Sequence, residues 1–489
     1  MFEVVTFGVP PDLAQCIALT VLEMPPCRSS PTLVVAPPAV LNVWEKQVND
    51  HVCSSVGMRL ATFHRQFKKD AIAKIRAGET DLVLTTYATL AKEAASESSA
   101  LFTTNWHRVI LDEAHNIRNG KTKSAKACMK LKSKFRWCVT ATPITNSPTD
   151  LGTLLEFIRV PPLDVEESVF RKLIGSGLSG KKSYDDAKVA LARLRSLTSH
   201  VVLRRLKGIL DDDGSALPPK ESITLDVTLD TEARALYSDM ARQLREQIDS
   251  SSEVQVLRNY MKILERMTRL RQVCCTPVLL GKDDRQKRDL FDKFGFGAKA
   301  TALVAELQRV PANEKVVIFA EHVQFLHHLQ DSIQHALAAG ELIMTDGGDT
   351  TERYEGSSSM SFTRRKTIID LFNSDEEESP RILLASLKSA GVGIELTRAN
   401  HVFLMQPYWN EPIENQAIDR TYRIGQTRPV RVVRFITRGS IEQRMVEWQQ
   451  RKSTLATGAL TRLTKKEQDK LKVDQIREWL SEEDLSLSE

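Results

Sequence analysis

Two adjacent acidic residues at the end of an apolar run are the feature of this sequence that most directly indicates chemistry. Asp112 and Glu113 end the run RVILDE and are followed by Ala114 and His115. The run is typical of a strand buried in a parallel sheet, where functional groups collect at the carboxyl ends of the strands. One carboxylate there can hold Mg²⁺ while the next orients or deprotonates an attacking water, as phosphoryl transfer requires. The alternative is a solvated helix start, in which the two acids complement the helix dipole.

A second apolar run, RWCVTATPITN, follows downstream and contains two hydroxyl side chains and a proline near its end. We predict that these hydroxyls, Thr140 and Thr142, relay between a nucleotide and a nucleic acid. The alternative is that both are ordinary strand residues, because threonine has a high strand propensity. The pairing of this run with the acidic strand end favours the phosphoryl-transfer interpretation.

The second half of the chain contains arginines and glycines at spacings that suit phosphate binding. In ENQAIDRTYRIGQTRPV, Arg420 and Arg423 lie three residues apart, shortly after Gln416. This spacing predicts that both lie on one face of a helix and point at the same phosphate. An arginine finger of this kind accelerates phosphoryl transfer by about 10³ to 10⁵. Upstream, Gly391 and Gly393 follow an apolar run, where a bare backbone can approach phosphate or sugar closely.

The apolar runs that must position these residues fall into two groups, separated by long helical patterns. The first group is PTLVVAPP, DLVLTTY, RVILDEAH and RWCVTATP, and the second is KVVIFAEH, RILLASLKSAGVGIEL, HVFLMQPYW and VRVVRFI. Between them, TEARALYSDMARQLREQI and LRNYMKILERMTRLRQV have helical periodicity. The pattern predicts an α/β protein with two parallel-sheet lobes and a helical insertion between them. We place the first lobe at 1–220, the insertion and linker at 221–298, the second lobe at 299–452 and a charged helical tail at 453–489.

The segment GDTTERYEGSSSMSF is predicted by its composition to be a flexible surface loop.

The composition of the whole chain excludes few classes of function. A formal net charge of +5 permits nucleic acid binding without requiring it. Because no uninterrupted apolar run has transmembrane length and no signal peptide is recognisable, we expect no membrane association and an intracellular location.

Cysteine usage argues against a disulfide framework and against a zinc site. The chain has seven cysteines, an odd number, and no pair of them has the two-residue spacing of a zinc ligand motif. The neighbours Cys274 and Cys275 are therefore predicted to be a reduced, buried pair.

Taken together, these motifs resemble the two-lobed motor of the Swi/Snf family of DNA-dependent ATPases within helicase superfamily two. The resemblance covers about residues 13 to 450 and follows the family's order, with TLVVAPPAVLNVWEKQV, VLTTYATL, RVILDEAHNIRN, VTATPITNSPTDL, LLASLKSAGVGIELT and QAIDRTYRIGQ. DEAHNIRN, LLEFIRVPPLD and LPPK are most similar to the repair and transcription-termination subgroup that includes the helicase-like transcription factor. The resemblance implies two RecA-like lobes, ATP and Mg²⁺ as cofactors, and double-stranded DNA as partner. Chromatin or other DNA-bound proteins are further candidate partners, and a nuclear location is expected.

The resemblance also assigns roles to particular residues. Asp112 is expected to hold Mg²⁺, and the catalytic set is Asp112, Glu113, Arg420 and Arg423. ATP contacts are assigned to His115, Gly391, Gly393 and Gln416, and DNA backbone contacts to Pro37, Pro38, Thr85 and Thr86. The alternative for the last two is strand propensity alone. We expect the acidic strand end to face the two arginines across a cleft between the lobes.

Several members of the subgroup carry a zinc-binding RING finger between the lobes. The corresponding part of this chain has only Cys274 and Cys275. Ubiquitin-ligase activity is therefore not expected.

The phosphate loop of the family is the one motif that we do not find. Family members have a sequence like GLGKT directly before the helix that begins QCIALT, and the corresponding positions are Val9, Pro10, Pro11, Asp12 and Leu13. Two prolines remove two N–H donors, Asp12 places a negative charge where lysine is expected, and Leu13 has no hydroxyl for Mg²⁺. Losing two or more charge-assisted hydrogen bonds weakens ATP binding by about 10² to 10⁴-fold. We therefore expect a poor ATPase.

Three explanations of the missing loop remain open. A truncated or mis-spliced reading frame is favoured, because Met1 falls inside the expected first lobe. A pseudo-ATPase that binds DNA or a partner without turnover is the second, and a strand-separating helicase with an unusual loop is the third. RIGQ and the helical insertion favour duplex translocation over strand separation. Ala141 and Glu395 also depart from the family's usual glycine and asparagine.

Overall fold

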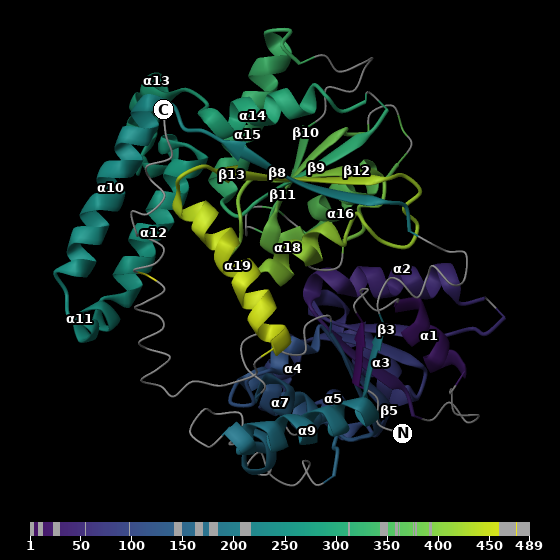
Figure 1. Cartoon of the computed structure of the whole chain (residues 1–489). Helices are drawn as coiled ribbons and strands as arrows, with labels where there is room; N and C mark the ends of the chain where they lie inside the picture. The colour runs from purple at the N-terminus through teal and green to yellow at the C-terminus, as the bar shows by residue number, and fades with distance from the viewer. Residues whose placement is uncertain are drawn as a thin grey trace. The chain divides into compact units, whose positions relative to one another are not determined.

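The computed structural model shows two compact units, each built around its own parallel sheet (Figure 1). The structure describes residues 4–7, 13–22, 30–53, 55–96, 98–140, 149–161, 170–175, 184–205, 217–311, 313–342, 351–356, 360, 362–374, 376, 379–390, 394–458 and 476. Of these, residues up to 205 form the first unit and residues from 217 onward form the second. The predicted class, α/β with two parallel-sheet lobes, is confirmed.

The sheet of the first unit has the strand order β3-β4-β2-β5-β6-β1-β7 in the described part of the chain. Its strands are β1 (Val4–Phe7), β2 (Thr32–Ala36), β3 (Leu60–Phe63), β4 (Leu82–Thr86), β5 (Trp106–Asp112), β6 (Ser133–Val139) and β7 (Val202–Arg205). Neighbouring strands pair in parallel. β2 and β4 are buried at every position, because helices cover a central parallel strand on both faces.

The helices of the first unit present apolar faces to this sheet. They are α1 (Leu13–Leu22), α2 (Leu41–His51), α3 (Lys68–Ala77), α4 (Tyr87–Glu93), α5 (Ala100–Thr103), α6 (Lys123–Lys130), α7 (Thr149–Phe157) and α9 (Tyr184–Val201), with the short turns η1 (Pro38–Val40), η2 (Arg65–Phe67), η3 (Ala114–Ile117) and η4 (Arg171–Gly175). α2 buries Leu41, Trp44 and Val48, at spacings of three and four that place them on one helix face. The predicted helix at QCIALT is confirmed as part of α1.

The sheet of the second unit has the order β10-β11-β9-β12-β13-β8 among the described residues. Its strands are β8 (Lys220–Val227), β9 (Lys315–Ala320), β10 (Thr351–Tyr354), β11 (Ile382–Ser386), β12 (Ala399–Leu404) and β13 (Val430–Thr437). The prediction of a loop is wrong for Thr351–Tyr354, which pairs in parallel with β11. Lys220–Val227, at the start of the predicted insertion and linker, instead pairs with β13 along its whole length. Both are edge strands with polar residues on their open sides, so the sequence lacks the apolar run of a central strand.

The predicted helical insertion forms an elongated projection beside the second sheet, seen as α10, α11 and α12 in Figure 1. The helices of this unit are α10 (Thr231–Asp249), α11 (Glu253–Arg258), α12 (Tyr260–Cys275), α13 (Asp284–Phe294), α14 (Ala298–Leu307), α15 (Val323–Ala338), α16 (Phe362–Phe372), α17 (Leu387–Ala390), α18 (Glu411–Ile418) and α19 (Ile441–Gly458), with η7 (Pro277–Leu280). α10 packs on α12 through Tyr237, Leu244 and Ile248. The finer division of the chain at 221, 299 and 453 stays a prediction.

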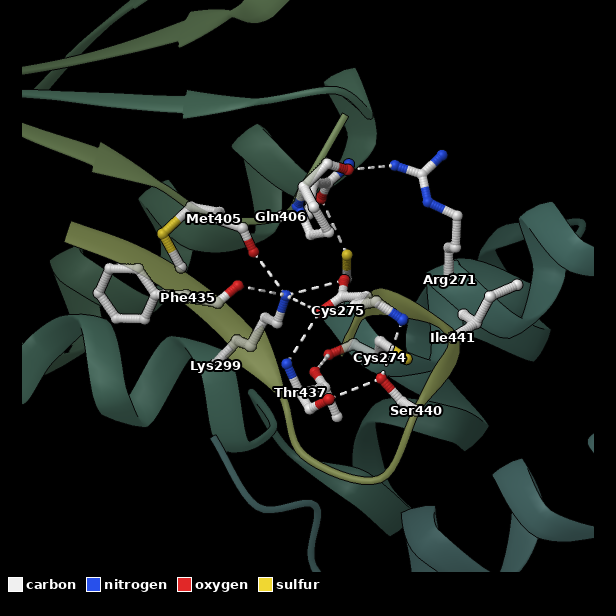
Figure 2. Close-up of polar contacts among 12 residues, drawn as sticks. Arg271, Cys274, Cys275, Lys299, Met405, Gln406, Phe435, Thr437, Ser440 and Ile441 are labelled. Carbon is white, nitrogen blue, oxygen red and sulfur yellow. Dashed lines mark hydrogen bonds and ion pairs between the residues drawn. The ribbon is translucent and has the colours of Figure 1, made fainter. Parts of the chain in front are cut away.

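A buried ion pair joins α14 to α19 in the second unit (Figure 2). Lys299 in α14 and Glu442 in α19 are both 0% exposed, and Lys299 Nζ lies 2.9 and 2.7 Å from the two carboxylate oxygens. The ammonium also donates to the carbonyl oxygens of Met405, at 2.6 Å, and Phe435, at 3.2 Å. Glu442 accepts a further hydrogen bond from the Thr437 N–H at 3.0 Å. Two helices and the ends of β12 and β13 therefore meet at one compensated pair of charges.

The prediction for the adjacent cysteines is confirmed. Cys274 and Cys275 are buried and free, and burial raises the pKa of the Cys274 thiol to about 12. The pKa of Cys275 is also raised by burial, and its thiol donates to Gln406 Oε1 at 3.0 Å. Both thiols therefore stay protonated and poorly reactive at neutral pH.

Two negative findings concern the described residues alone. There, no three His, Cys, Asp or Glu side chains gather closely enough to hold a metal ion between them. Within the same residues, no helix is both long enough and apolar enough to span a membrane.

We expect Lys299→Met to lower the free energy of unfolding of the second unit by about 3 to 5 kcal/mol, because it leaves Glu442 buried without its cation. Arg242→Met is the control. Arg242 pairs with Asp239 at 2.6 Å, but the side chains are 64% and 62% exposed, so its loss should cost under about 1 kcal/mol. Urea unfolding followed by circular dichroism measures both. Equal destabilisation by the two substitutions would show that the buried pair contributes no more than a surface pair.

Candidate active site

The acidic strand end predicted from the sequence lies at the carboxyl edge of the first sheet. Asp112 is the last residue of β5 and is 4% exposed. Its Oδ1 accepts the Glu113 N–H at 2.8 Å, and its Oδ2 accepts the indole N–H of Trp44 at 2.9 Å. The Tyr87 hydroxyl donates to its main-chain oxygen at 2.8 Å. Side chain and backbone of Asp112 are thus both held in place.

Glu113 follows with a backbone conformation that is unusual for its residue type. Its φ of 50° and ψ of 51° lie in the left-handed region, which costs an L-residue other than glycine about 1 to 2 kcal/mol. Non-glycine residues with such strain are concentrated at functional sites. The left-handed residue directly follows the end of β5 and precedes η3.

His115 connects the end of β5 to the end of β6, the two strand ends that the sequence analysis assigned to one site. Its Nδ1 lies 3.2 Å from Thr140 Oγ1 and 3.3 Å from Glu113 Oε2. Thr140 directly follows β6 and is 1% exposed. The structure therefore brings together Asp112, Glu113, His115 and Thr140. The coupling role of Thr140 stays a prediction, and its contact with His115 supports it.

The four positions assigned to DNA contacts differ in accessibility. Pro37 and Pro38 form the turn between β2 and α2, where Pro38 is exposed. Thr85 and Thr86 are both 0% exposed. Thr85 Oγ1 donates to the Phe63 carbonyl oxygen at 3.0 Å, and Thr86 Oγ1 accepts the Thr89 N–H at 3.1 Å as the cap of α4. These hydrogen bonds favour structural roles for the two threonine side chains, whereas the proline turn is open to a ligand.

Several predicted positions lie outside the described residues. These are Val9, Pro10, Pro11 and Asp12 of the phosphate-loop segment, Thr142 and its neighbour Ala141, and the glycines Gly391 and Gly393. Glu395 is described, and its main-chain oxygen accepts the side-chain amide of Asn373 at 2.8 Å.

The prediction that Arg420 and Arg423 share one helix face is wrong. α18 ends at Ile418, and both arginines lie in the following turn, Arg420 nearly buried at 5% exposure and Arg423 half-buried. Beyond Ile418, the Arg420 carbonyl oxygen accepts the Leu396 N–H at 3.0 Å, and the Thr421 carbonyl oxygen accepts the Gln426 side-chain amide at 3.1 Å. These bonds take up carbonyl groups that a continuing helix would use. Gln416 lies within α18.

Sequence reasoning missed three residues that organise the strand ends. Trp44 and Tyr87 hold Asp112, as described above. In the second unit, the Arg271 guanidinium donates to Glu321, at 2.5 Å, and to the Pro407 carbonyl oxygen, at 2.8 Å. Arg271 also lies over the Trp409 ring, 5.0 Å from its centroid. A signal for Trp44 was present, because a tryptophan on a buried helix face needs an acceptor for its indole N–H.

The donor set at Asp112 fits Mg²⁺. Mg²⁺ is usually bound through one or two carboxylates, with waters and substrate phosphates completing its shell. A carboxylate has about four acceptor positions, and hydrogen bonds from neighbouring groups commonly orient such a ligand. Asp112 at a buried strand end is a carboxylate of this kind. His115 and Thr140 lie beside it within reach of the same edge.

Comparison with known proteins matches the chain to two family domains. Residues 14–279 match the SNF2-related domain, and residues 298–425 match the helicase conserved C-terminal domain. The helicase-like transcription factor of Homo sapiens is 28% identical over 92% of this chain and 53% of its own length. DNA repair protein rad8 of Schizosaccharomyces pombe is 28% identical over 89% of this chain and 48% of its own. DNA repair protein RAD5A of Arabidopsis thaliana is 28% identical over 88% and 50%.

The chain thus spans about half the length of these relatives. Among solved structures, the SWI2/SNF2 ATPase core of Sulfolobus solfataricus in complex with dsDNA is 26% identical, with a TM-score of 0.40, over 100% of this chain and 93% of that one. The SNF2-related domain matches more than half of the residues of this chain, and a helicase C-terminal domain follows. This chain therefore belongs to the SNF2-related family of ATPases.

Proposed function

We propose that the chain is an ATP-dependent motor of the Swi/Snf type that translocates on double-stranded DNA, in DNA repair or chromatin remodelling, with impaired ATP hydrolysis. The observation that carries the proposal is the strand end in which Asp112 is aimed by two hydrogen bonds and Glu113 is held in a strained conformation. Membership of the SNF2-related family and the similarity to two DNA repair proteins support it. A nuclear location and chromatin or DNA-bound proteins as partners follow from the same proposal.

The proposed site residues have separate roles in phosphoryl transfer. Asp112 would hold Mg²⁺, which when bound neutralises phosphate charge. Glu113 accepts a proton from the attacking water or orients it, and His115 connects this carboxylate to Thr140. Arg420 and Arg423 stabilise phosphate charge from the second unit, while Gly391, Gly393 and Gln416 contact ATP and Thr142 couples with Thr140. The expectation that the arginines face Asp112 across a cleft stays part of the proposal.

The impairment follows from the residues at the phosphate-loop positions. Pro10 and Pro11 have no N–H to donate, Asp12 repels phosphate and Leu13 has no hydroxyl. The match to the SNF2-related domain starts at residue 14, directly after these positions. No RING finger activity is included, since Cys274 and Cys275 are buried structural residues.

The same residues favour one alternative, a pseudo-ATPase that binds DNA or a partner without turnover. A strand-separating helicase is a third candidate, because it would use the same acidic strand end. Duplex-stimulated ATP hydrolysis would identify the motor, and duplex binding without hydrolysis would identify the pseudo-ATPase. Unwinding of a partial duplex would identify the helicase.

We expect the chain to bind duplex DNA at low salt, because the proposed backbone contacts do not depend on Val9–Leu13. The binding constant should fall linearly with salt on a logarithmic scale, since phosphate contacts release counterions. Fluorescence anisotropy of a labelled duplex measures it. A single strand of the same sequence is the control and should bind more weakly. A folded preparation that binds no duplex at low salt would refute the proposed partner.

Replacing Val9–Leu13 with Gly-Leu-Gly-Lys-Thr, together with a family-like acidic segment before it, should produce duplex-stimulated ATP hydrolysis. The change supplies backbone donors, the lysine and the magnesium-binding hydroxyl together. Phosphate release with and without duplex measures the effect, and the unmodified chain should show little or none.

In the repaired background, Glu113→Gln should abolish turnover while leaving nucleotide binding largely intact. Substantial DNA-stimulated turnover by the unmodified chain would mean that the loop has been misjudged. A folded but inactive repair would place the defect elsewhere, with Ala141 and Glu395 as the first positions to change.

A further inference from the structure

The carboxylate of Asp112 is oriented by a residue from a different element, Trp44 of α2. Trp44 is 0% exposed and Asp112 is 4% exposed, and the indole N–H lies 2.9 Å from Oδ2. A hydrogen bond to a carboxylate is strengthened by the charge, and more so away from water. Since Oδ1 is held by the Glu113 N–H, Trp44 determines how the second oxygen is presented.

The helix that carries Trp44 begins at the exposed proline turn. Pro37 caps η1, the Val40 N–H donates to the Pro37 carbonyl oxygen at 3.0 Å, and Val40 is itself helical and leads directly into α2. From Pro38 to Trp44 the chain is therefore one continuous helical segment, about 9 Å long at the helical rise per residue. A ligand that displaces the turn would therefore move the indole together with this segment.

We propose that Trp44 is a positioning residue that aims the Asp112 carboxylate for Mg²⁺ and makes it sensitive to duplex DNA at the Pro37–Pro38 turn. The inference rests on the proposed function, which supplies both the metal and the DNA. It assigns to Trp44 a task beyond filling the core, because the acceptor that its indole N–H uses is the carboxylate proposed to hold Mg²⁺.

Tyr87 provides a matched reference on the same aspartate. Its hydroxyl donates to the main-chain oxygen of Asp112 at 2.8 Å, and burial raises the pKa of Tyr87 well above its usual value, so it remains a donor. Through this hydrogen bond it anchors the end of β5 by the main chain. Removing the Tyr87 hydroxyl therefore deletes one hydrogen bond to Asp112 and leaves the carboxylate direction to Trp44.

The first test measures Mn²⁺ binding to the whole chain by electron paramagnetic resonance, without DNA. Trp44→Phe should weaken Mn²⁺ binding at the Asp112 site about tenfold, the lower end of what loss of an orienting hydrogen bond costs a metal site. Tyr87→Phe should weaken it by less than about threefold, since the carboxylate keeps its hydrogen bonds from the Trp44 indole and the Glu113 N–H. Asp112→Asn identifies the site by abolishing it.

Because phenylalanine is smaller than tryptophan, a second variant separates the lost N–H from a cavity. Benzothienylalanine at position 44 keeps the ring shape and has sulfur in place of the N–H. It should weaken Mn²⁺ binding as Trp44→Phe does. Unchanged binding in this variant, or equal weakening by Tyr87→Phe, would overturn the assignment.

The second test uses ¹⁹F NMR of protein labelled with 5-fluorotryptophan, which keeps the indole N–H of Trp44. The Trp44 resonance is assigned by its loss in Trp44→Phe, and Trp137, in β6 of the same unit, is the internal reference. Adding a short blunt duplex should shift the Trp44 resonance in step with duplex binding and leave Trp137 in place. If the duplex binds and the Trp44 resonance does not move, the coupling is wrong while the proposed function stands. If no duplex binds, the proposed function is wrong, and so is this inference, which depends on it.

Discussion

A charge that leaves water must find a complete set of partners inside the protein, and the Lys299–Glu442 pair shows how strongly this constrains the second unit. Both groups are fully buried, and the ammonium reaches two carboxylate oxygens and two main-chain carbonyl oxygens. The partners come from α14, α19 and the ends of β12 and β13. None of these elements can shift without leaving a buried charge short of partners, which costs several kcal/mol per ion. The arrangement of helices around the second sheet is therefore fixed by electrostatics as well as by apolar packing.

The same constraint explains the acidic strand end of the first unit. Asp112 is nearly buried, yet hydrogen bonds from Trp44 and the Glu113 backbone compensate its carboxylate. Glu113 is half-buried, with its side chain 15% exposed, and its left-handed backbone ends the strand at a cost of about 1 to 2 kcal/mol. A structure under selection for stability alone would place glycine or asparagine there. The strained glutamate is better explained by its carboxylate than by packing.

The sequence predicted what depends on local composition and failed where tertiary partners decide. Continuous Val, Leu and Ile runs located the central strands, because only a strand covered on both faces needs them. The edge strands β8 and β10 were missed, since their open sides are polar. The helix expected through Arg420 ends early, where the Leu396 N–H and the Gln426 side chain take up the Arg420 and Thr421 carbonyl oxygens. Trp44 and Asp112 are 68 residues apart in sequence, so their hydrogen bond depends on how α2 packs on the sheet.

The two parts of the proposed nucleotide site, the carboxylate of Asp112 and the phosphate loop, depend on the fold to different degrees. The carboxylate half is part of the sheet itself, with Asp112 at the end of β5 and its donors on α2 and α4. The phosphate half needs backbone N–H groups and a lysine from a single loop. α1 packs through Cys16 and Ile17, each 2% exposed, and neither side chain belongs to that loop. The residues at positions 9–13 can therefore depart from the family pattern without loss of the sheet or of the aimed carboxylate.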